Sequence, residues 1–224
     1  MKLSPWDCHL TDDVQLQLRK LPCVKTLSLD EIQRIVEPLD VEKAVLGGGE
    51  PAIDAQLTDV TRSLDSLNIK TVLLTNGYAL NENRIHKLRD ANLGEICVSI
   101  KALRDVLHIQ YTGKSNQRVL KNFNLLNRSG IQIRAESVLI PQLIEQDEIK
   151  SIASFIASVD SSIPYRIDGY VPVQGASWRR PSKEEMLKAV EEAKKHLESV
   201  SYIYSGTELK GSVLNVYPPL QRES

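Results

Sequence analysis

The stretch AVLGGGEP, residues 44–51, ends a short apolar run with three consecutive glycines, a glutamate and a proline. In α/β proteins ligands bind beyond the carboxyl ends of parallel strands, where glycine lets the backbone approach a ligand closely. Glycine and proline also make tight turns without any ligand, so the run alone has two interpretations. It has neither the GxGxxG spacing of a dinucleotide site nor the GK[ST] ending of a P-loop, which disfavours both of these phosphate sites.

Around this run, apolar segments of strand length alternate with segments of helical period. The sequence predicts strands at 43–47, 70–75, 95–100, 131–140 and 164–173, and helices at 28–39, 54–67, 80–92, 114–130, 144–158 and 182–198. Ser28 with Glu31, and Ser182 with Glu185, have the spacing of a helix-capping box. Strict alternation predicts parallel strands joined by crossover helices, and therefore an α/β sheet or barrel.

Composition limits the class of protein. With 224 residues, 42% of them hydrophobic and 25% charged, the chain is expected to fold as a single globular domain. A net charge of -1 gives no electrostatic reason to expect nucleic acid or an anionic membrane as partner. No apolar run has the length of a membrane span and the N-terminus lacks the apolar core of a signal peptide, so we expect a cytoplasmic protein.

The glycine run lies at the end of the first predicted strand, and polar residues or turn residues lie near the ends of the next three predicted strands. They are Thr75, Asn76 and Gly77 after the second strand, Ser99 and Lys101 at the end of the third, and Arg134, Glu136 and Ser137 in the fourth. Each one alone is as readily explained as a solvated loop residue. Together they indicate a site along one rim of the sheet, where the active site of a βα barrel is built.

From about residue 40 to 198, the segments GGGEP, LLTNGY, VSIKA, YTGKSNQRVLKNFNLLNRSGIQIRAESVLIP and YRIDGYVPVQG resemble the radical S-adenosylmethionine (radical SAM) enzymes in order and spacing. The sequence is most similar to pyruvate formate-lyase activating enzyme and other activators of glycyl-radical enzymes. The resemblance implies a partial (βα)6 TIM-like barrel with parallel strands inside and helices outside.

The resemblance also implies which residues bind the cofactor. Residues Gly47, Gly48, Gly49 and Glu50 would bind the ammonium group of S-adenosylmethionine. Thr75, Asn76 and Ser99 would line its ribose and methionine region, and Lys101 or Arg134 would pair with its carboxylate. A carboxylate in a partly dry cleft needs such a cationic partner. Loops after 101 and after 170 would close on the substrate, and no residue is assigned as catalytic.

The sequence departs from the family at its defining motif. Radical SAM enzymes hold a four-iron four-sulfur (4Fe-4S) cluster with a CxxxCxxC loop after the first strand, and this motif is missing. Cys8 lies about where the last cluster cysteine is expected and is the metal-ligand candidate. Cys97, inside the apolar run EICVSI, is interpreted as a small buried core residue, and Cys23 as an ordinary free cysteine in a loop. Either the chain is truncated or it is a natural relative that has lost the cluster, and the missing first strand favours truncation.

We therefore expect one radical SAM-like domain over 1–224: a remnant of the cluster loop at 1–27, a βα core at 28–198 and an extension at 199–224 that adds at most an edge strand. The resemblance implies an oxidoreductase that cleaves S-adenosylmethionine reductively to a 5'-deoxyadenosyl radical. Its substrate would be a glycyl-radical enzyme or a small molecule, with flavodoxin or ferredoxin as reductant. The alternatives are a cluster-free barrel that acts as a binding module and, more weakly, a sugar-phosphate barrel enzyme.

Overall fold

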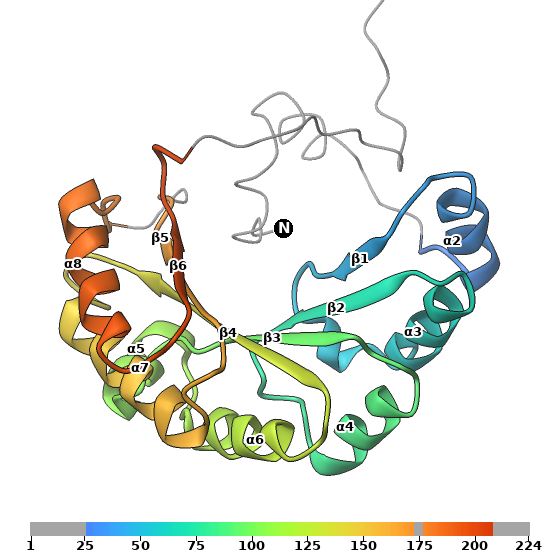
Figure 1. Ribbon diagram of the computed structural model, residues 1–224, viewed down its shortest axis with the longest axis horizontal. Helices are drawn as coiled ribbons and strands as arrows, with labels where there is room; N and C mark the ends of the chain where they lie inside the picture. The colour runs from blue at the N-terminus through green and yellow to red at the C-terminus, as the bar shows by residue number, and fades with distance from the viewer. Residues whose placement is uncertain (1–25, 173–176, 208–224) are drawn as a thin grey trace, which may run out of the picture.

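Among the described residues, six parallel strands make a single open sheet in which spatial order follows chain order (Figure 1). The computed structural model describes residues 26–172 and 177–207. The strands are β1 (Lys43–Leu46), β2 (Lys70–Thr75), β3 (Glu95–Ser99), β4 (Gln132–Leu139), β5 (Tyr165–Gly169) and β6 (Val200–Ile203). Because β1 and β6 are not paired with each other, the sheet is a partial barrel, as predicted.

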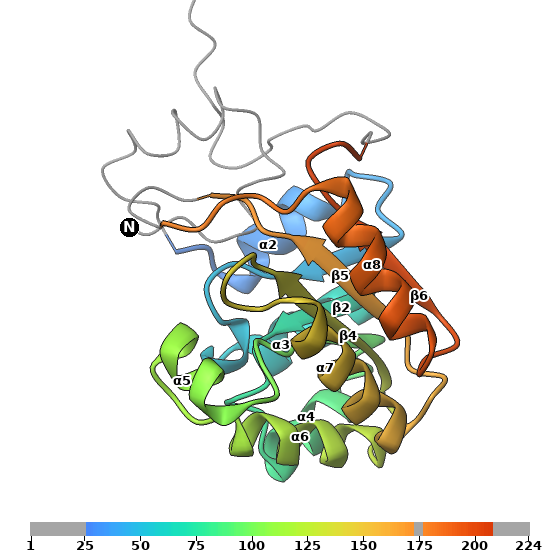
Figure 2. The ribbon, with the colours of Figure 1, turned by 90° about the vertical axis from the view of Figure 1, so that its left-hand side faces the viewer.

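Helices follow the strands and cover the outer, convex face of the sheet. They are α2 (Leu29–Val36), α3 (Leu57–Ser66), α4 (Glu82–Arg89), α5 (Asp105–Thr112), α6 (Gln117–Asn127), α7 (Gln146–Val159) and α8 (Lys183–Lys194), with the short 3-10 helix η2 (Pro51–Ile53) after β1. Figure 2 shows α7 and α8 beside the last strands, and α7 packs on β4 while α8 packs on β5 and β6. No helix within the described residues is both long and apolar enough to cross a membrane.

The predicted elements are confirmed, and two of the helix ends form as their sequence indicates. The Ser28 and Ser182 side chains accept from the N–H groups of Glu31 and Glu185, whose own carboxylates accept from the cap backbones. These reciprocal bonds satisfy backbone donors that a helix N-terminus otherwise leaves free. In the extension at 199–224, expected to add at most an edge strand, Val200–Ile203 form the strand β6, which pairs with β5. The remnant of the cluster loop predicted at 1–27, where the first strand was expected to be missing, lies almost entirely outside the described residues.

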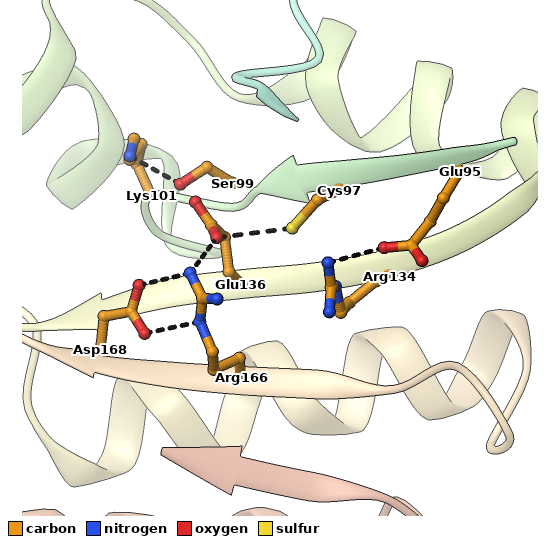
Figure 3. Close-up of polar contacts among 8 residues, drawn as sticks. All are labelled: Glu95, Cys97, Ser99, Lys101, Arg134, Glu136, Arg166 and Asp168. Atoms are coloured by element: carbon orange, nitrogen blue, oxygen red, sulfur yellow. Dashed lines mark hydrogen bonds and ion pairs between the residues drawn. The ribbon is translucent and has the colours of Figure 1, made fainter. Parts of the chain in front are cut away.

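Successive side chains along each strand point to opposite faces of the sheet, and the two faces have different environments. Residues such as Leu73, Ile96 and Ile167 point toward the helices and are completely buried in the main core. Their neighbours point to the concave inner face, where Val72, Leu74 and Cys97 make a small separate apolar cluster. Further along the same face, toward β4 and β5, the side chains are charged (Figure 3). The barrel interior is therefore apolar near β2 and polar near β5.

One expectation about the segment after Lys101 is wrong. That segment was expected to be a loop, but residues 105–112 form helix α5. Its N-cap, Arg104, makes no side-chain cap bond, and the helix is weakly amphipathic, so the sequence gives little helical signal. Gly113 ends it with a φ of +77° in the left-handed region that glycine favours.

A buried carboxylate fixes the chain between β3 and α5. Glu148, in the first turn of α7, is completely buried, and its Oε1 accepts from the backbone N–H groups of Leu103 at 2.6 Å and Arg104 at 2.8 Å. Its Oε2 accepts from Nε of Arg104 at 2.5 Å. Asn116 adds a bond from Nδ2 to the Ala102 carbonyl at 3.2 Å. The backbone that carries Lys101 is thereby attached to two other helices.

Replacing this carboxylate should destabilise the fold. We expect Glu148→Gln to lower the free energy of unfolding by about 2 kcal/mol, because a buried acceptor bonded to three donors loses its charge. Urea denaturation followed by circular dichroism measures the change. The control is Asp147→Asn on the exposed side of the same helical turn, for which we expect less than about 0.5 kcal/mol. Equal losses for the two variants would contradict the role given to Glu148.

Candidate functional site

The glycine run after β1 is attached to the end of β2 by one carboxylate. Oε1 of Glu50 accepts from the Thr75 hydroxyl at 2.5 Å and from the backbone N–H of Ala52 at 3.0 Å. Its Oε2 accepts from the backbone N–H of Asn76 at 2.7 Å. Thr75 itself is buried and also accepts from the N–H of Gly77. Glu50, Thr75 and Asn76, predicted separately as site residues, are thus in direct contact.

The glycines themselves are required by backbone conformation. Gly48 and Gly49 have φ values of +90° and +58°, in the region where a side chain is strained. A Cβ added to either one would meet no atom of the described residues within 4 Å, so these residues leave the space beside them open. Gly47 differs, because its Cβ would lie 3.4 Å from Cδ1 of Leu74. Open space next to a bare backbone at the carboxyl end of a strand is suitable for a ligand.

Across the rim, the end of β3 presents an ammonium group with little to hold it. Nζ of Lys101 donates to Oγ of Ser99 at 2.6 Å, its one hydrogen bond among the described residues. An ammonium has three protons to donate, so two of them remain available to a ligand. Ser99 is buried, and its own hydroxyl proton is likewise not used within the described part of the chain.

The surroundings of Lys101 set its charge. Burial lowers the pKa of this lysine, because water that would solvate the ammonium is removed. The carboxylates of Glu136, Asp168 and Glu50 oppose that shift, in decreasing order of effect. An anionic ligand at the ammonium would act in the same direction as these carboxylates and favour the charged form.

Next to Ser99, the inner face carries an ion network that the sequence analysis did not foresee (Figure 3). Arg166 in β5 donates from Nε and Nη2 to the two carboxylate oxygens of Asp168, at 2.8 and 2.9 Å. Its Nη2 also donates to Oε2 of Glu136 in β4, at 2.8 Å. The sequence signal was present in YRIDGY, where Arg166 and Asp168 alternate with buried Tyr165 and Ile167 and so share the opposite face.

Arg134 lies elsewhere on this face. It is the third residue of β4, and its Nη2 forms an ion pair of 2.7 Å with Oε1 of Glu95, the first residue of β3. This pair is at the amino ends of the strands, whereas Ser99 ends β3 and Lys101 follows it. Arg134 is therefore not brought together with the residues of the carboxyl rim.

Cys97 is the only cysteine among the described residues, and its thiol contacts Glu136 of the ion network. Sγ donates to Oε2 of Glu136 at 3.4 Å, and the side chain is almost completely buried. Burial, reinforced by the Glu136 charge, raises the pKa of Cys97 to about 12 against the lowering effects of Arg134 and Arg166. Cys97 thus behaves as the buried core thiol that the sequence predicted. Cys8, the metal-ligand candidate, and Cys23 lie outside the described residues.

The model of the radical SAM superfamily matches residues 8–156. The chain belongs to the radical SAM superfamily. Membership implies S-adenosylmethionine and a 4Fe-4S cluster as cofactors. Within residues 26–172 and 177–207 no group of three or more His, Cys, Asp or Glu side chains can hold a metal ion, so these residues do not fit the cluster.

Two relatives of this radical SAM chain are named as activating enzymes. A putative glycyl-radical enzyme activating enzyme of Methanocaldococcus jannaschii is 32% identical over 178 residues, which are 77% of this chain and 68% of that protein. The trans-4-hydroxy-L-proline dehydratase activating enzyme of Clostridioides difficile is 31% identical over 177 residues, 70% of this chain and 55% of that protein. The chain thus spans between about half and two thirds of the length of these relatives.

A solved structure supports the fold of this radical SAM domain. A domain of the pyruvate-formate lyase-activating enzyme of Bacteroides vulgatus matches with a TM-score of 0.63 at 16% identity, covering 71% of this chain and 97% of that one. The predicted resemblance and the predicted partial barrel are both confirmed.

The environment of Cys97 predicts its reactivity. With a pKa of about 12, roughly one Cys97 in ten thousand is a thiolate at pH 8, and the thiolate is the form that iodoacetamide attacks. We expect alkylation of Cys97 in the native protein to be about a thousandfold slower than in denaturant, measured by peptide mass spectrometry. Native alkylation within about tenfold of the denatured rate would contradict this burial and charge environment.

Proposed function

We propose that this radical SAM protein binds S-adenosylmethionine at the carboxyl rim formed by β1, β2 and β3. The observation that carries the proposal is the Glu50 carboxylate, which holds the glycine run against the end of β2, while the described residues leave the space beside Gly48 and Gly49 open. The ammonium of the cofactor would bind at Gly47–Glu50, where Oε2 of Glu50 has accepted a single bond within the described residues. The carboxylate of the cofactor would bind Nζ of Lys101.

The two candidate cations differ in what already holds them. In the part of the chain that the structure describes, Lys101 has one neutral partner and lies at the rim, whereas Arg134 is paired with the Glu95 carboxylate at the other end of the strands. A carboxylate at Arg134 would have to compete with an existing ion pair. We therefore propose Lys101 as its partner. Thr75 and Asn76 support the loop through bonds to Glu50, and Ser99 offers its hydroxyl to the ribose and methionine region.

The proposed activity is that of an activating enzyme for a glycyl-radical enzyme, with flavodoxin or ferredoxin as reductant. With both cofactors bound, the chemistry of the family is reductive cleavage of S-adenosylmethionine to a 5'-deoxyadenosyl radical that abstracts hydrogen from the substrate. The names of the two relatives support this activity. We propose a single domain over 1–224 in which 1–27, including Cys8, belongs to the cluster loop and 199–224 extends the core.

The two cations provide a sharp test. We expect Lys101→Met to weaken S-adenosylmethionine binding about 10- to 100-fold, the loss typical of a charge-assisted hydrogen bond. Arg134→Met should change the affinity less than about threefold, because the Arg134 guanidinium is paired with the Glu95 carboxylate. Titration calorimetry measures both variants, and thermal unfolding checks that each is folded. The opposite ranking would assign the carboxylate to Arg134.

The same lysine should make binding depend on pH. Burial lowers the pKa of Lys101 in the free protein, and a bound carboxylate would favour its protonated form. Affinity should therefore fall as pH rises through this lowered pKa, at a lower pH than an ordinary lysine would give. The amino group of the ligand titrates as well, so the measured quantity is the difference between the wild-type and Lys101→Met profiles. Parallel profiles would contradict the contact.

Anaerobic reconstitution with iron and sulfide tests the redox activity. Four irons per chain, and an electron paramagnetic resonance spectrum of the reduced protein that changes when S-adenosylmethionine is added, would support this activity in the chain, in which Cys8 is the one cysteine assigned to the incomplete cluster motif. Cys8→Ser should abolish such a signal. Binding of S-adenosylmethionine without stoichiometric iron would instead support the cluster-free binding module.

A further inference from the structure

Helices α4 and α6 border a groove on the outer surface of the barrel. The two helices lie side by side, as Figures 1 and 2 both show. The groove has a volume of about 690 Å³, which is in the range of small-molecule pockets. Tyr78 and Glu82 line one wall, and Arg118, Lys121, Asn122 and Leu125 of α6 line the other. The groove is therefore separate from the carboxyl-rim site.

A mostly buried amide presents an unused acceptor to this groove. Asn122 is only 4% exposed, and its Nδ2 donates to the carbonyl oxygens of Gly77 at 2.8 Å and Tyr78 at 3.3 Å. These two bonds fix the orientation of the amide. Oδ1 has no hydrogen-bond partner among the described residues, and it is not one of the buried atoms sealed from solvent. A fixed acceptor on a buried side chain requires a donor, and the groove is where one can reach it.

The α6 wall carries two cations. The guanidinium of Arg118 lies over the Tyr78 ring, with Cζ 4.8 Å from the ring centroid. Stacking uses the face of the guanidinium and leaves its in-plane N–H groups available to a carboxylate. Lys121 lies one helical turn further along α6. Among the described residues neither side chain is paired with a carboxylate, so this wall suits an anionic group.

The opposite wall carries a single carboxylate. Glu82 is the first residue of α4, is exposed, and has no ion pair or hydrogen bond within the described part of the chain. A phosphate between the walls would meet this carboxylate as a like charge. An ammonium group, in contrast, would satisfy both Glu82 and Oδ1 of Asn122. Half-buried Tyr78 and Leu125 add apolar surface.

We propose that this groove binds a free α-amino acid with an apolar side chain. Its carboxylate pairs with the cations of α6, its ammonium donates to Glu82 and to Oδ1 of Asn122, and its side chain contacts Tyr78 and Leu125. The zwitterion uses every unpaired group of the groove, which neither a phosphate nor an uncharged molecule does. The inference goes beyond the proposed function and does not depend on it.

The groove is connected to the glycine run by a chain of contacts. Asn122 holds the carbonyl oxygens of Gly77 and Tyr78, and the N–H of the preceding Asn76 donates to Oε2 of Glu50. An amino acid at Oδ1 of Asn122 therefore acts on the turn that supports the carboxyl rim. The side-chain NH₂ signals of Asn122 and the backbone N–H signals of Gly77 and Tyr78 report its binding directly.

The test is an NMR titration of the isotope-labelled full chain without S-adenosylmethionine. The probes are L-valine, L-leucine and L-phenylalanine, each with its N-acetyl derivative, which has no ammonium, and its amide, which has no carboxylate. We expect at least one of the free amino acids to bind and to shift the Asn122 NH₂ signals. Its two derivatives should bind about tenfold more weakly, because each loses one charge-assisted contact.

Two variants assign these contacts to the two walls. Glu82→Gln should reduce the preference for the free amino acid over its N-acetyl form at least about threefold and leave the preference over the amide unchanged. Arg118→Met should do the reverse. The matched controls are Asp90→Asn at the other end of α4 and Arg128→Met at the other end of α6, which should leave both preferences unchanged. Thermal unfolding establishes that all four variants are folded.

Lys101→Met separates this groove from the carboxyl rim. An amino acid whose affinity falls in Lys101→Met but not in Glu82→Gln binds at the rim, and that result would overturn the inference. Three other results would overturn it as well: no binding of any of the three amino acids, equal binding of the free and derivatised forms, or tighter binding of inorganic phosphate. Because the cofactor is omitted throughout, none of these outcomes is confused with a failure of the proposed function.

Discussion

The contact between the Glu50 carboxylate and the end of β2 is the interaction on which the site depends. Two consecutive glycines with positive φ have few restraints of their own, and β1 is a short strand at the edge of the sheet. Glu50 supplies the missing restraint by accepting from Thr75, Asn76 and Ala52 at once. The loop can therefore remain bare of side chains and still have one conformation, which a ligand-binding backbone requires.

Burial explains why the remaining polar groups are arranged in pairs. A charge on the inner face of a barrel loses water, and it is tolerated only if an opposite charge or several hydrogen bonds replace that water. Arg166 has two carboxylates, Arg134 has Glu95, and Glu148 has three donors. Among the described residues Lys101 has one neutral partner and Oε1 of Glu136 has none, and Figure 3 shows both next to the Ser99 hydroxyl.

Much of this could be predicted from the sequence, because the strands and most helices have strong local patterns. The alternation of apolar runs and capping boxes indicated the order of elements, and parallel strands necessarily bring Glu50, Thr75 and Ser99 to one edge. Helix α5 was missed because its N-cap residue, Arg104, makes no side-chain cap bond. The partner of Arg134 was missed because it depends on strand register, since Glu95 lies 39 positions away in sequence and adjacent in space.

The ion network around Arg166 could not be predicted from the residues at the strand ends alone. The site residues predicted from the sequence were those near the ends of the strands. Arg166, in contrast, is the second residue of β5 and faces inward from within the strand. Its position becomes meaningful only with register, which sets Arg166 opposite Glu136 and Glu136 opposite Ser99. A barrel interior binds ligands through the sides of its strands as well as through their ends. The residues that distinguish one substrate from another can therefore lie inside strands that, read singly, look purely structural.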